Sequence, residues 1–103
     1  MKIKKKAMCG KFESGDVEVT IEPNEENGIQ IELNSVVKPI FGEAILETVQ
    51  EELKKFEVND AKIVLHDKGA LDCVIRARMQ SAILRSVGEK YDWSKEDALW
   101  KAV

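Results

Sequence analysis

Strict alternation of apolar and polar side chains between positions 17 and 22 constrains the fold more than any other feature. This segment reads VEVTIE. Successive side chains of a strand point to opposite faces of a sheet, so the pattern predicts a β-strand with one buried face. That buried face needs a cover, and the rest of the chain has to supply it.

Two further strands are predicted around this one. Residues 6–12 form a partner strand, with Ser14 and Gly15 at the tip of a tight hairpin, and the alternating segment 29–34 follows a dense cluster of turn-forming residues at 23–28. Glycine supplies the positive φ that such hairpin turns need. Three successive strands joined by turns predict an antiparallel meander.

The cover for the sheet is predicted to be helical. Apolar residues recur at spacings of three and four over residues 40–56, namely at Ile40, Phe41, Ile45, Val49, Leu53 and Phe56. This spacing places them on one side of an α-helix. A short apolar run at 61–66 predicts a fourth strand covered on both faces, and residues 71–87 predict a second helix. The predicted class is therefore α+β: a small, mainly antiparallel β-sheet, made of a three-strand meander plus a fourth strand, covered by two α-helices in the order βββαβα.

Length and charge limit the range of functions. A chain of 103 residues predicts one domain, over residues 1–88, and the composition changes from Glu89 onward, so residues 89–103 are expected to form a C-terminal tail with a short helix. The net charge of −3 argues against nucleic acid as a partner, since phosphate binding needs a concentrated basic surface. No apolar run is long enough to span a bilayer, so we expect a cytoplasmic protein without a membrane partner.

Residues able to catalyse a reaction are few. Cys9 and Cys73 lack metal-ligand spacing and are predicted to be buried free thiols, while His66 is the only histidine and is expected to be structural. We therefore predict no metal site and no catalytic residue, and an enzyme in its own right is the least favoured class.

Ser14 is the most distinctive polar residue. The predicted hairpin places its hydroxyl at a protruding point between Glu13 and the pair Gly15-Asp16, with no histidine nearby in the sequence to activate it. Such a serine is better suited to being modified than to attacking a substrate. Spacing alone is also compatible with an ordinary turn residue.

Longer motifs favour the first interpretation. The chain carries Glu13-Ser14-Gly15-Asp16-Val17 near its start and, well downstream, the run Asp67-Lys68-Gly69-Ala70-Leu71-Asp72-Cys73 followed by Arg76-Ala77-Arg78. Together with Gly10, Pro23, Asn34-Ser35-Val36 and Phe41-Gly42, these segments resemble the acyl carrier (gamma) subunit of citrate lyase over residues 7–88.

The resemblance implies a specific function. A covalent 2'-(5''-phosphoribosyl)-3'-dephospho-CoA group would be attached through a phosphodiester to Ser14, within the attachment motif Glu13, Gly15 and Asp16. Its thiol would carry acetyl and citryl groups between the alpha and beta subunits of citrate lyase during cleavage of citrate to oxaloacetate and acetate, after loading by a prosthetic-group transferase. The carrier itself would catalyse nothing.

Alternatives remain at this point. The same features are compatible with the carrier subunit of citramalate lyase or malonate decarboxylase, because acyl specificity belongs to the other subunits. A small interaction module without a covalent group is a further alternative. The sequence also leaves open whether the loop 67–73 contacts the arm or a partner.

Overall fold

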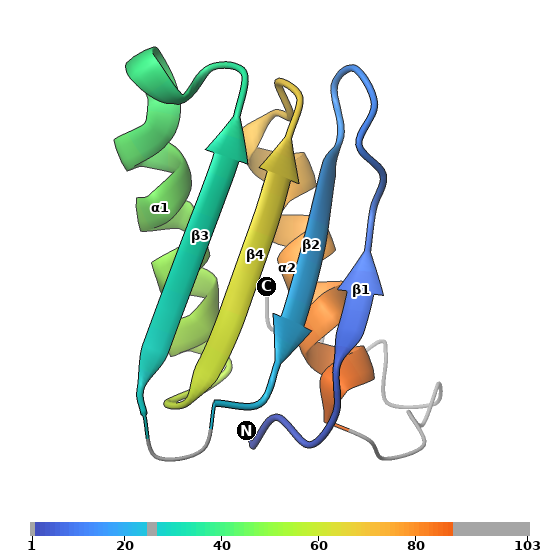
Figure 1. Ribbon diagram of the computed structural model, residues 1–103, viewed down its shortest axis with the longest axis vertical. Coiled ribbons are helices and arrows are strands. Elements are labelled where there is room, and N and C mark those ends of the chain that lie inside the picture. Colours follow the sequence, from blue (N-terminus) through green and yellow to red (C-terminus); the bar gives the residue numbers. More distant parts are fainter. Residues whose placement is uncertain (1, 25–26, 88–103) are drawn as a thin grey trace.

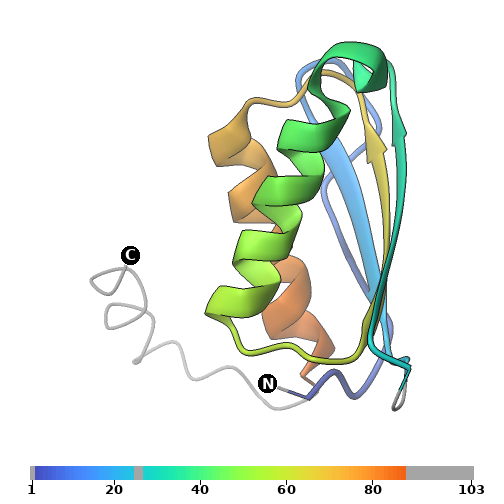
Figure 2. The same ribbon diagram turned by 90° about the vertical axis from the view of Figure 1, so that its left-hand side faces the viewer.

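A computed structural model describes residues 2–24 and 27–87, which form a four-stranded sheet with two helices packed on one of its faces (Figure 2). The elements in chain order are β1 (Ala7–Cys9), β2 (Val17–Glu22), β3 (Ile29–Ser35), α1 (Lys38–Lys55), β4 (Ala61–Asp67) and α2 (Asp72–Ser86). The predicted α+β class and the order βββαβα are confirmed. The predicted tail at 89–103 lies outside the described residues.

The predicted meander is wrong. The strand order across the sheet is β1-β2-β4-β3, so β4 lies between β2 and β3 (Figure 1). β4 pairs antiparallel with β2 and parallel with β3, and α1 is the crossover that parallel neighbours require. The connection before β3 is held at the start of β4, where the Gly28 N–H donates to the Asp60 carboxylate and the Ala61 N–H donates to the Gly28 carbonyl.

The first hairpin is also longer than predicted. β1 extends only over Ala7–Cys9, and residues 10–16 form a loop before β2 begins. Gly10 starts this loop with φ +88°, and a Cβ built there would lie 1.9 Å from the Val17 carbonyl oxygen. Only glycine allows the backbone at position 10 to approach the Val17 carbonyl so closely. The pairing of β1 with β2 ends just before it, at Cys9 and Val19.

The core lies between the sheet and the helices. β2 and β4 contribute the fully buried side chains of its centre: Val17, Val19, Ile21, Ala61, Ile63 and Leu65. Their neighbours along each strand face the opposite, open side of the sheet, where Val64 and His66 are half-buried. β4 is therefore covered on one face only, and the prediction that both faces are covered is wrong.

The helices bury narrower faces than the apolar patterns predicted. In α1 the stripe is buried from Gly42 onward, whereas Ile40 and Phe41 in its first turn are exposed. Pro39 lies in that first turn, where its missing N–H costs no hydrogen bond.

In α2 Met79 is fully buried although no pattern indicated it. Leu71, which the predicted helix 71–87 included, precedes the helix and is 70% exposed. In the described ranges, neither helix is long and apolar enough to cross a membrane.

The two sides of β4 should differ sharply in their response to truncation. We expect Leu65→Ala to lower the free energy of unfolding by about 2–5 kcal/mol, because it leaves a cavity at a fully buried position. Val64→Ala, on the half-buried open face, is the matched control and should cost clearly less. Urea denaturation of both variants measures this, with the slope m unchanged. Equal losses would contradict the one-sided core.

Candidate functional site

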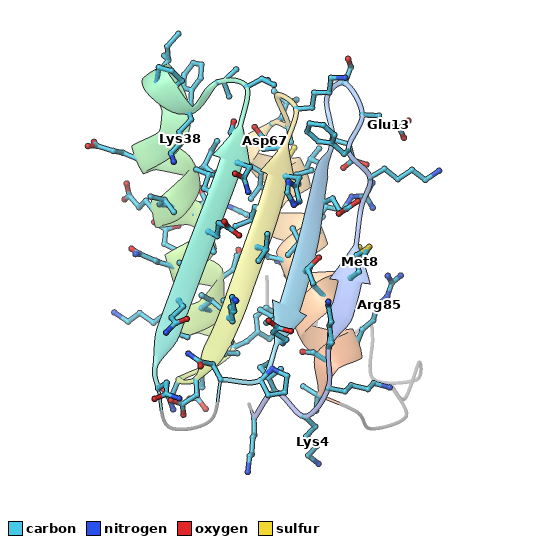
Figure 3. The ribbon with its side chains drawn as sticks, viewed as in Figure 1. Lys4, Met8, Glu13, Lys38, Asp67 and Arg85 are labelled. Atoms are coloured by element: carbon cyan, nitrogen blue, oxygen red, sulfur yellow. The ribbon has the colours of Figure 1, made fainter. Side chains whose placement is uncertain are left out.

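Three connections meet at one end of the molecule. The loop 10–16 between β1 and β2, the connection from β4 to α2 and the connection from β3 to α1 all lie at the upper end in Figure 1. Figure 3 shows Glu13, Asp67 and Lys38 at this end, with Lys4 at the other. Ser14 therefore lies in a group of connections that the sheet topology brings together.

Ser14 occupies the second position of a tight turn. The Asp16 N–H donates to the Glu13 carbonyl oxygen at 2.9 Å, and Gly15 takes φ +79° at the third position. A positive φ there is the signature of a type II turn. Ser14 is exposed, and a Cβ built on Gly15 would meet no atom within 4 Å. In the part of the chain that the structure describes, no hydrogen bond holds the Ser14 hydroxyl, so the hydroxyl is open to approach.

The backbone that directly follows Ser14 is fastened to the connection between β4 and α2. The Gly15 N–H donates to the Lys68 carbonyl at 2.9 Å, and the Lys68 N–H donates to the Asp16 carbonyl at 3.1 Å. This pair of bonds continues the β2–β4 ladder by one step beyond Val17 and Asp67. The loop 67–73 therefore contacts the turn that carries Ser14.

The side chain of Asp67 fixes the connection between β4 and α2 by hydrogen bonds. Its carboxylate is fully buried and accepts hydrogen bonds from the Ser35 hydroxyl at 2.7 Å and from the backbone N–H groups of Gly69 and Ala70. The Ser35 hydroxyl in turn accepts a bond from the Val37 N–H at the start of α1. One buried carboxylate thus joins the end of β3, the end of β4 and the loop that supports Ser14.

Asp16 is fastened from the other side by an arginine of α2. Its carboxylate accepts bonds from Arg78 Nε at 3.0 Å and Arg78 Nη2 at 3.2 Å, and from the backbone N–H groups of Lys11 and Val17. The hydrogen bond from Arg78 lowers the pKa of Asp16 below its ordinary value, and the other bonds act in the same direction against partial burial. A bidentate pair of this kind fixes orientation as well as charge.

The basic surface predicted for α2 is largely used within the protein. Arg76 bonds Glu51 and the buried Glu52 of α1 as well as Asp72, and Arg85 donates to the Met8 carbonyl of β1. The bond from Thr48, followed by those from Arg76, lowers the pKa of Asp72. The arginines therefore attach α2 to α1, to β1 and to the Ser14 loop.

The other predicted residues are dispersed. Cys9 is buried as expected, but Cys73 is exposed, so that prediction was wrong for one of the two thiols. His66 lies on the open face of the sheet, with its ring edge-on to Phe12 at 6.1 Å between centroids. Among the described residues no group of acidic, histidine or cysteine side chains could hold a metal ion.

A groove of 490 Å³ lies far from Ser14. It runs between β3 and α1 and is lined by residues that include Ile29, Leu46 and Val58. Ile29 pairs with Ala61 at the start of β4, whereas the Ser14 turn lies beyond the end of β4. The candidate site is therefore a protruding turn and not a pocket.

Sequence reasoning missed the residues that support the turn. Asp67, Lys68 and Arg78 lie within the segments that carry the family resemblance, but the sequence left open whether the loop 67–73 contacts the arm or a partner. The backbone bonds of Lys68 could be found only once the pairing of β2 with β4 was known. The buried state of Asp67 had one signal, since it continues the odd-numbered buried positions of β4.

Neutralising Asp67 should loosen the Ser14 turn. In Asp67→Asn at least one of the three donors loses its acceptor in a buried place, which we expect to cost about 1–3 kcal/mol of unfolding free energy. The Gly15 and Lys68 amides should then exchange with solvent faster, as measured by hydrogen exchange. Glu32→Gln, an exposed carboxylate on β3, is the control and should change neither quantity. Unchanged exchange at Gly15 in Asp67→Asn would contradict the role of Asp67.

The pair of Asp16 and Arg78 should make stability depend on acid pH. Because the pKa of Asp16 in the folded protein lies below its ordinary 3.8, its contribution is fully present above that value and is lost as the pH falls through the folded pKa. We expect Asp16→Asn to be less stable than the parent at about pH 7, with the difference shrinking toward about pH 2. Urea denaturation across this range tests it. Glu13→Gln, exposed in the same loop, should follow the parent, and a pH-independent gap for Asp16→Asn would refute the pairing.

Known proteins resemble this chain along most of its length. Residues 4–86 match the protein family described as "ACP: Malonate decarboxylase delta subunit (MdcD)". The citrate lyase acyl carrier protein of Vibrio cholerae is 46% identical over 96 residues, covering 92% of this chain and 98% of the relative. That of Haemophilus ducreyi is 47% identical over 95 residues, with the same coverage of both chains.

Solved structures share the fold at low sequence identity. A chain of a Pseudomonas malonate decarboxylase hetero-tetramer in complex with malonate superposes with a TM-score of 0.56 at 23% identity, covering 81% of this chain and 84% of that one. Homoserine kinase from Cytophaga hutchinsonii gives 0.55 at 14% identity, covering 89% of this chain but only 38% of the kinase. These two likenesses concern the fold alone. The near-complete match at 46–47% identity shows more: the chain belongs to the citrate lyase acyl carrier protein family.

Proposed function

We propose that this protein is the acyl carrier subunit of a citrate lyase and that the Ser14 hydroxyl anchors a covalent 2'-(5''-phosphoribosyl)-3'-dephospho-CoA arm through a phosphodiester. Membership of the family supports the carrier role. The observation that carries the assignment of Ser14 is its exposure on a protruding turn whose backbone is bonded to Lys68 directly after the serine. A group attached there would be held at a fixed point and would extend away from the body.

The surroundings of Ser14 fit a large attached group. The turn is open around Gly15, where even an added Cβ would meet nothing within 4 Å, so the hydroxyl can accept a bulky substituent without displacing side chains. Asp16 is turned away from solvent by Arg78, which leaves Glu13 as the exposed carboxylate beside the hydroxyl. Any electrostatic attraction of the turn to a basic partner surface would therefore come from Glu13 and not from Asp16.

The chain presents this serine but does not activate it. A serine hydroxyl is a weak nucleophile unless an adjacent base removes its proton. His66 is half-buried against the Phe12 ring, and the carboxylate of Asp16 is bonded to Arg78. We infer that a prosthetic-group transferase supplies the base and loads the arm, and that the carrier is not an enzyme.

A tethered thioester explains why a carrier is needed. The arm, when attached, supplies a thiol that carries acetyl and citryl groups between the alpha (transferase) and beta (lyase) subunits, while citrate is cleaved to oxaloacetate and acetate. What the protein contributes is position: a fixed anchor raises the local concentration of the thioester at each active site, because encounter becomes intramolecular. The alpha subunit, the beta subunit and the loading transferase are the proposed partners.

A second candidate is the carrier subunit of malonate decarboxylase. The description of the matching family and the shared fold with a chain of the Pseudomonas hetero-tetramer favour it. Sequence identity favours citrate lyase instead, since the carriers so named are 46–47% identical and the malonate decarboxylase chain is 23% identical. Reconstitution with citrate lyase alpha and beta subunits separates the two.

Ser14→Ala should abolish loading and leave the fold intact. After co-expression with the loading enzymes, intact mass should show the gain of one arm on the parent chain, with the added mass in the peptide that contains Ser14. Ser14→Ala should gain none and should give no citrate cleavage with alpha and beta subunits, because the anchoring oxygen is missing.

Ser81→Ala, at a half-buried serine of α2, is the control and should load like the parent. Two outcomes would refute the assignment: a loaded Ser14→Ala variant, or full citrate cleavage by the assembly that contains it.

A further inference from the structure

Beside the Ser14 turn, three side chains gather on the open face of the sheet. Phe12 comes from the loop 10–16, His66 from β4 and Lys68 from the connection that follows β4. The Lys68 ammonium lies 5.5 Å from the centre of the Phe12 ring, and the His66 ring meets that ring edge-on at an interplanar angle of 70°. We call these three residues the Phe12 platform.

We propose that the Phe12 platform is a resting site for the nucleotide half of the arm, with Lys68 receiving the phosphodiester and the Phe12 ring receiving the adenine base. This inference rests on the proposed function, because it needs an arm on Ser14. It goes further in assigning binding roles to Lys68 and Phe12, with His66 positioning the ring, and all three lie outside the attachment motif. The distal half of the arm, which bears the thiol, would remain free to move.

The backbone places Lys68 opposite Gly15 and Asp16, the two residues that follow the proposed attachment point. The Lys68 carbonyl accepts a hydrogen bond from the Gly15 N–H, and the Lys68 N–H donates to the Asp16 carbonyl. Lys68 is therefore close to the residues that directly follow Ser14. A phosphodiester on the Ser14 oxygen carries one negative charge. The Lys68 side chain is exposed and flexible, and its ammonium can turn from the ring to that charge without breaking a bond of the fold.

The charges around the turn favour this side over the other. Glu13 points outward from the loop, on the side of β1 in Figure 3, and its exposed carboxylate would repel a phosphate. Asp16 is neutralised by Arg78 and therefore contributes little repulsion. In the described ranges Lys68 forms no ion pair with a carboxylate, since its ammonium lies over the ring, so it offers a positive charge to an incoming anion.

The exposure of Phe12 is the second, independent observation. The Phe12 side chain lies two positions before Ser14 and is 53% exposed. Burying an aromatic ring is favourable, so a ligand that covered the ring would be stabilised there. Aromatic side chains bind bases by stacking, because every base has a π-face. With Lys68 above the ring and His66 at its edge, the ring is held on the open side of the sheet, where the base of an arm anchored at Ser14 can reach it.

Nuclear magnetic resonance of the loaded carrier tests the inference without measuring activity. The parent chain is loaded by its transferase, and intact mass confirms one arm on Ser14. We expect the Phe12 ring signals to shift between the unloaded and loaded forms and to show nuclear Overhauser effects to the adenine protons. Phe41, 54% exposed in the first turn of α1, is the internal control and should not shift.

Variants separate the roles of the ring and of the cation. In the loaded parent, added salt should weaken the contact of Lys68 with the phosphodiester and shift the phosphorus signal. Lys68→Gln should remove this effect of salt, and Phe12→Leu should abolish the contacts to adenine. Phe41→Leu and Lys38→Gln should change neither. A chain that gains no arm refutes the proposed function itself. A chain that is loaded on Ser14, whose Phe12 ring neither shifts nor contacts the adenine, refutes only the resting site.

Discussion

The support of the Ser14 turn depends on one buried carboxylate. Asp67 carries a negative charge at a fully buried position, which would be strongly unfavourable without partners. The Ser35 hydroxyl and the N–H groups of Gly69 and Ala70 supply them, so the carboxylate imposes the path of the connection after β4. Lys68 lies in that connection and forms two backbone hydrogen bonds with the Ser14 turn. The position of the turn therefore depends on the hydrogen bonds that Asp67 accepts.

The second helix extends this support through its arginines. Arg78 reaches the loop by way of Asp16, Arg76 crosses to α1, and Arg85 reaches the backbone of β1. Exposed ion pairs contribute little to stability, so these contacts matter mainly because they are directional. A guanidinium bonded to a carboxylate by two nitrogens fixes orientation, and the turn that carries Ser14 is held between a strand ladder on one side and a helix on the other.

Much of the fold followed from local pattern, and the remainder depended on tertiary structure. Six elements were predicted in the right order: alternation gave β2 and β3, spacings of three and four gave α1, and a short apolar run gave β4. The place of β3 was mispredicted, since period-two alternation shows that a strand has a buried face but not which strand is its neighbour. The exposure of Ser14 was predicted from turn chemistry alone, whereas the roles of Asp67, Lys68 and Arg78 depend on β4 lying beside β2, which no local pattern encodes.

The proposed carrier role would place opposite demands on one small chain, since the anchor must be rigid and the attached arm mobile. If the turn itself moved, its disorder would add to that of the arm and lower the effective concentration of the thioester at each active site. The structure meets the first demand without a deep pocket: bonds from Lys68 and Arg78 hold the backbone and the Asp16 side chain, while the Ser14 hydroxyl stays outside every hydrogen bond of the described residues. Under the proposed function, the motion that a carrier needs would therefore come from the attached group, because hydrogen bonds restrain the protein backbone beneath it.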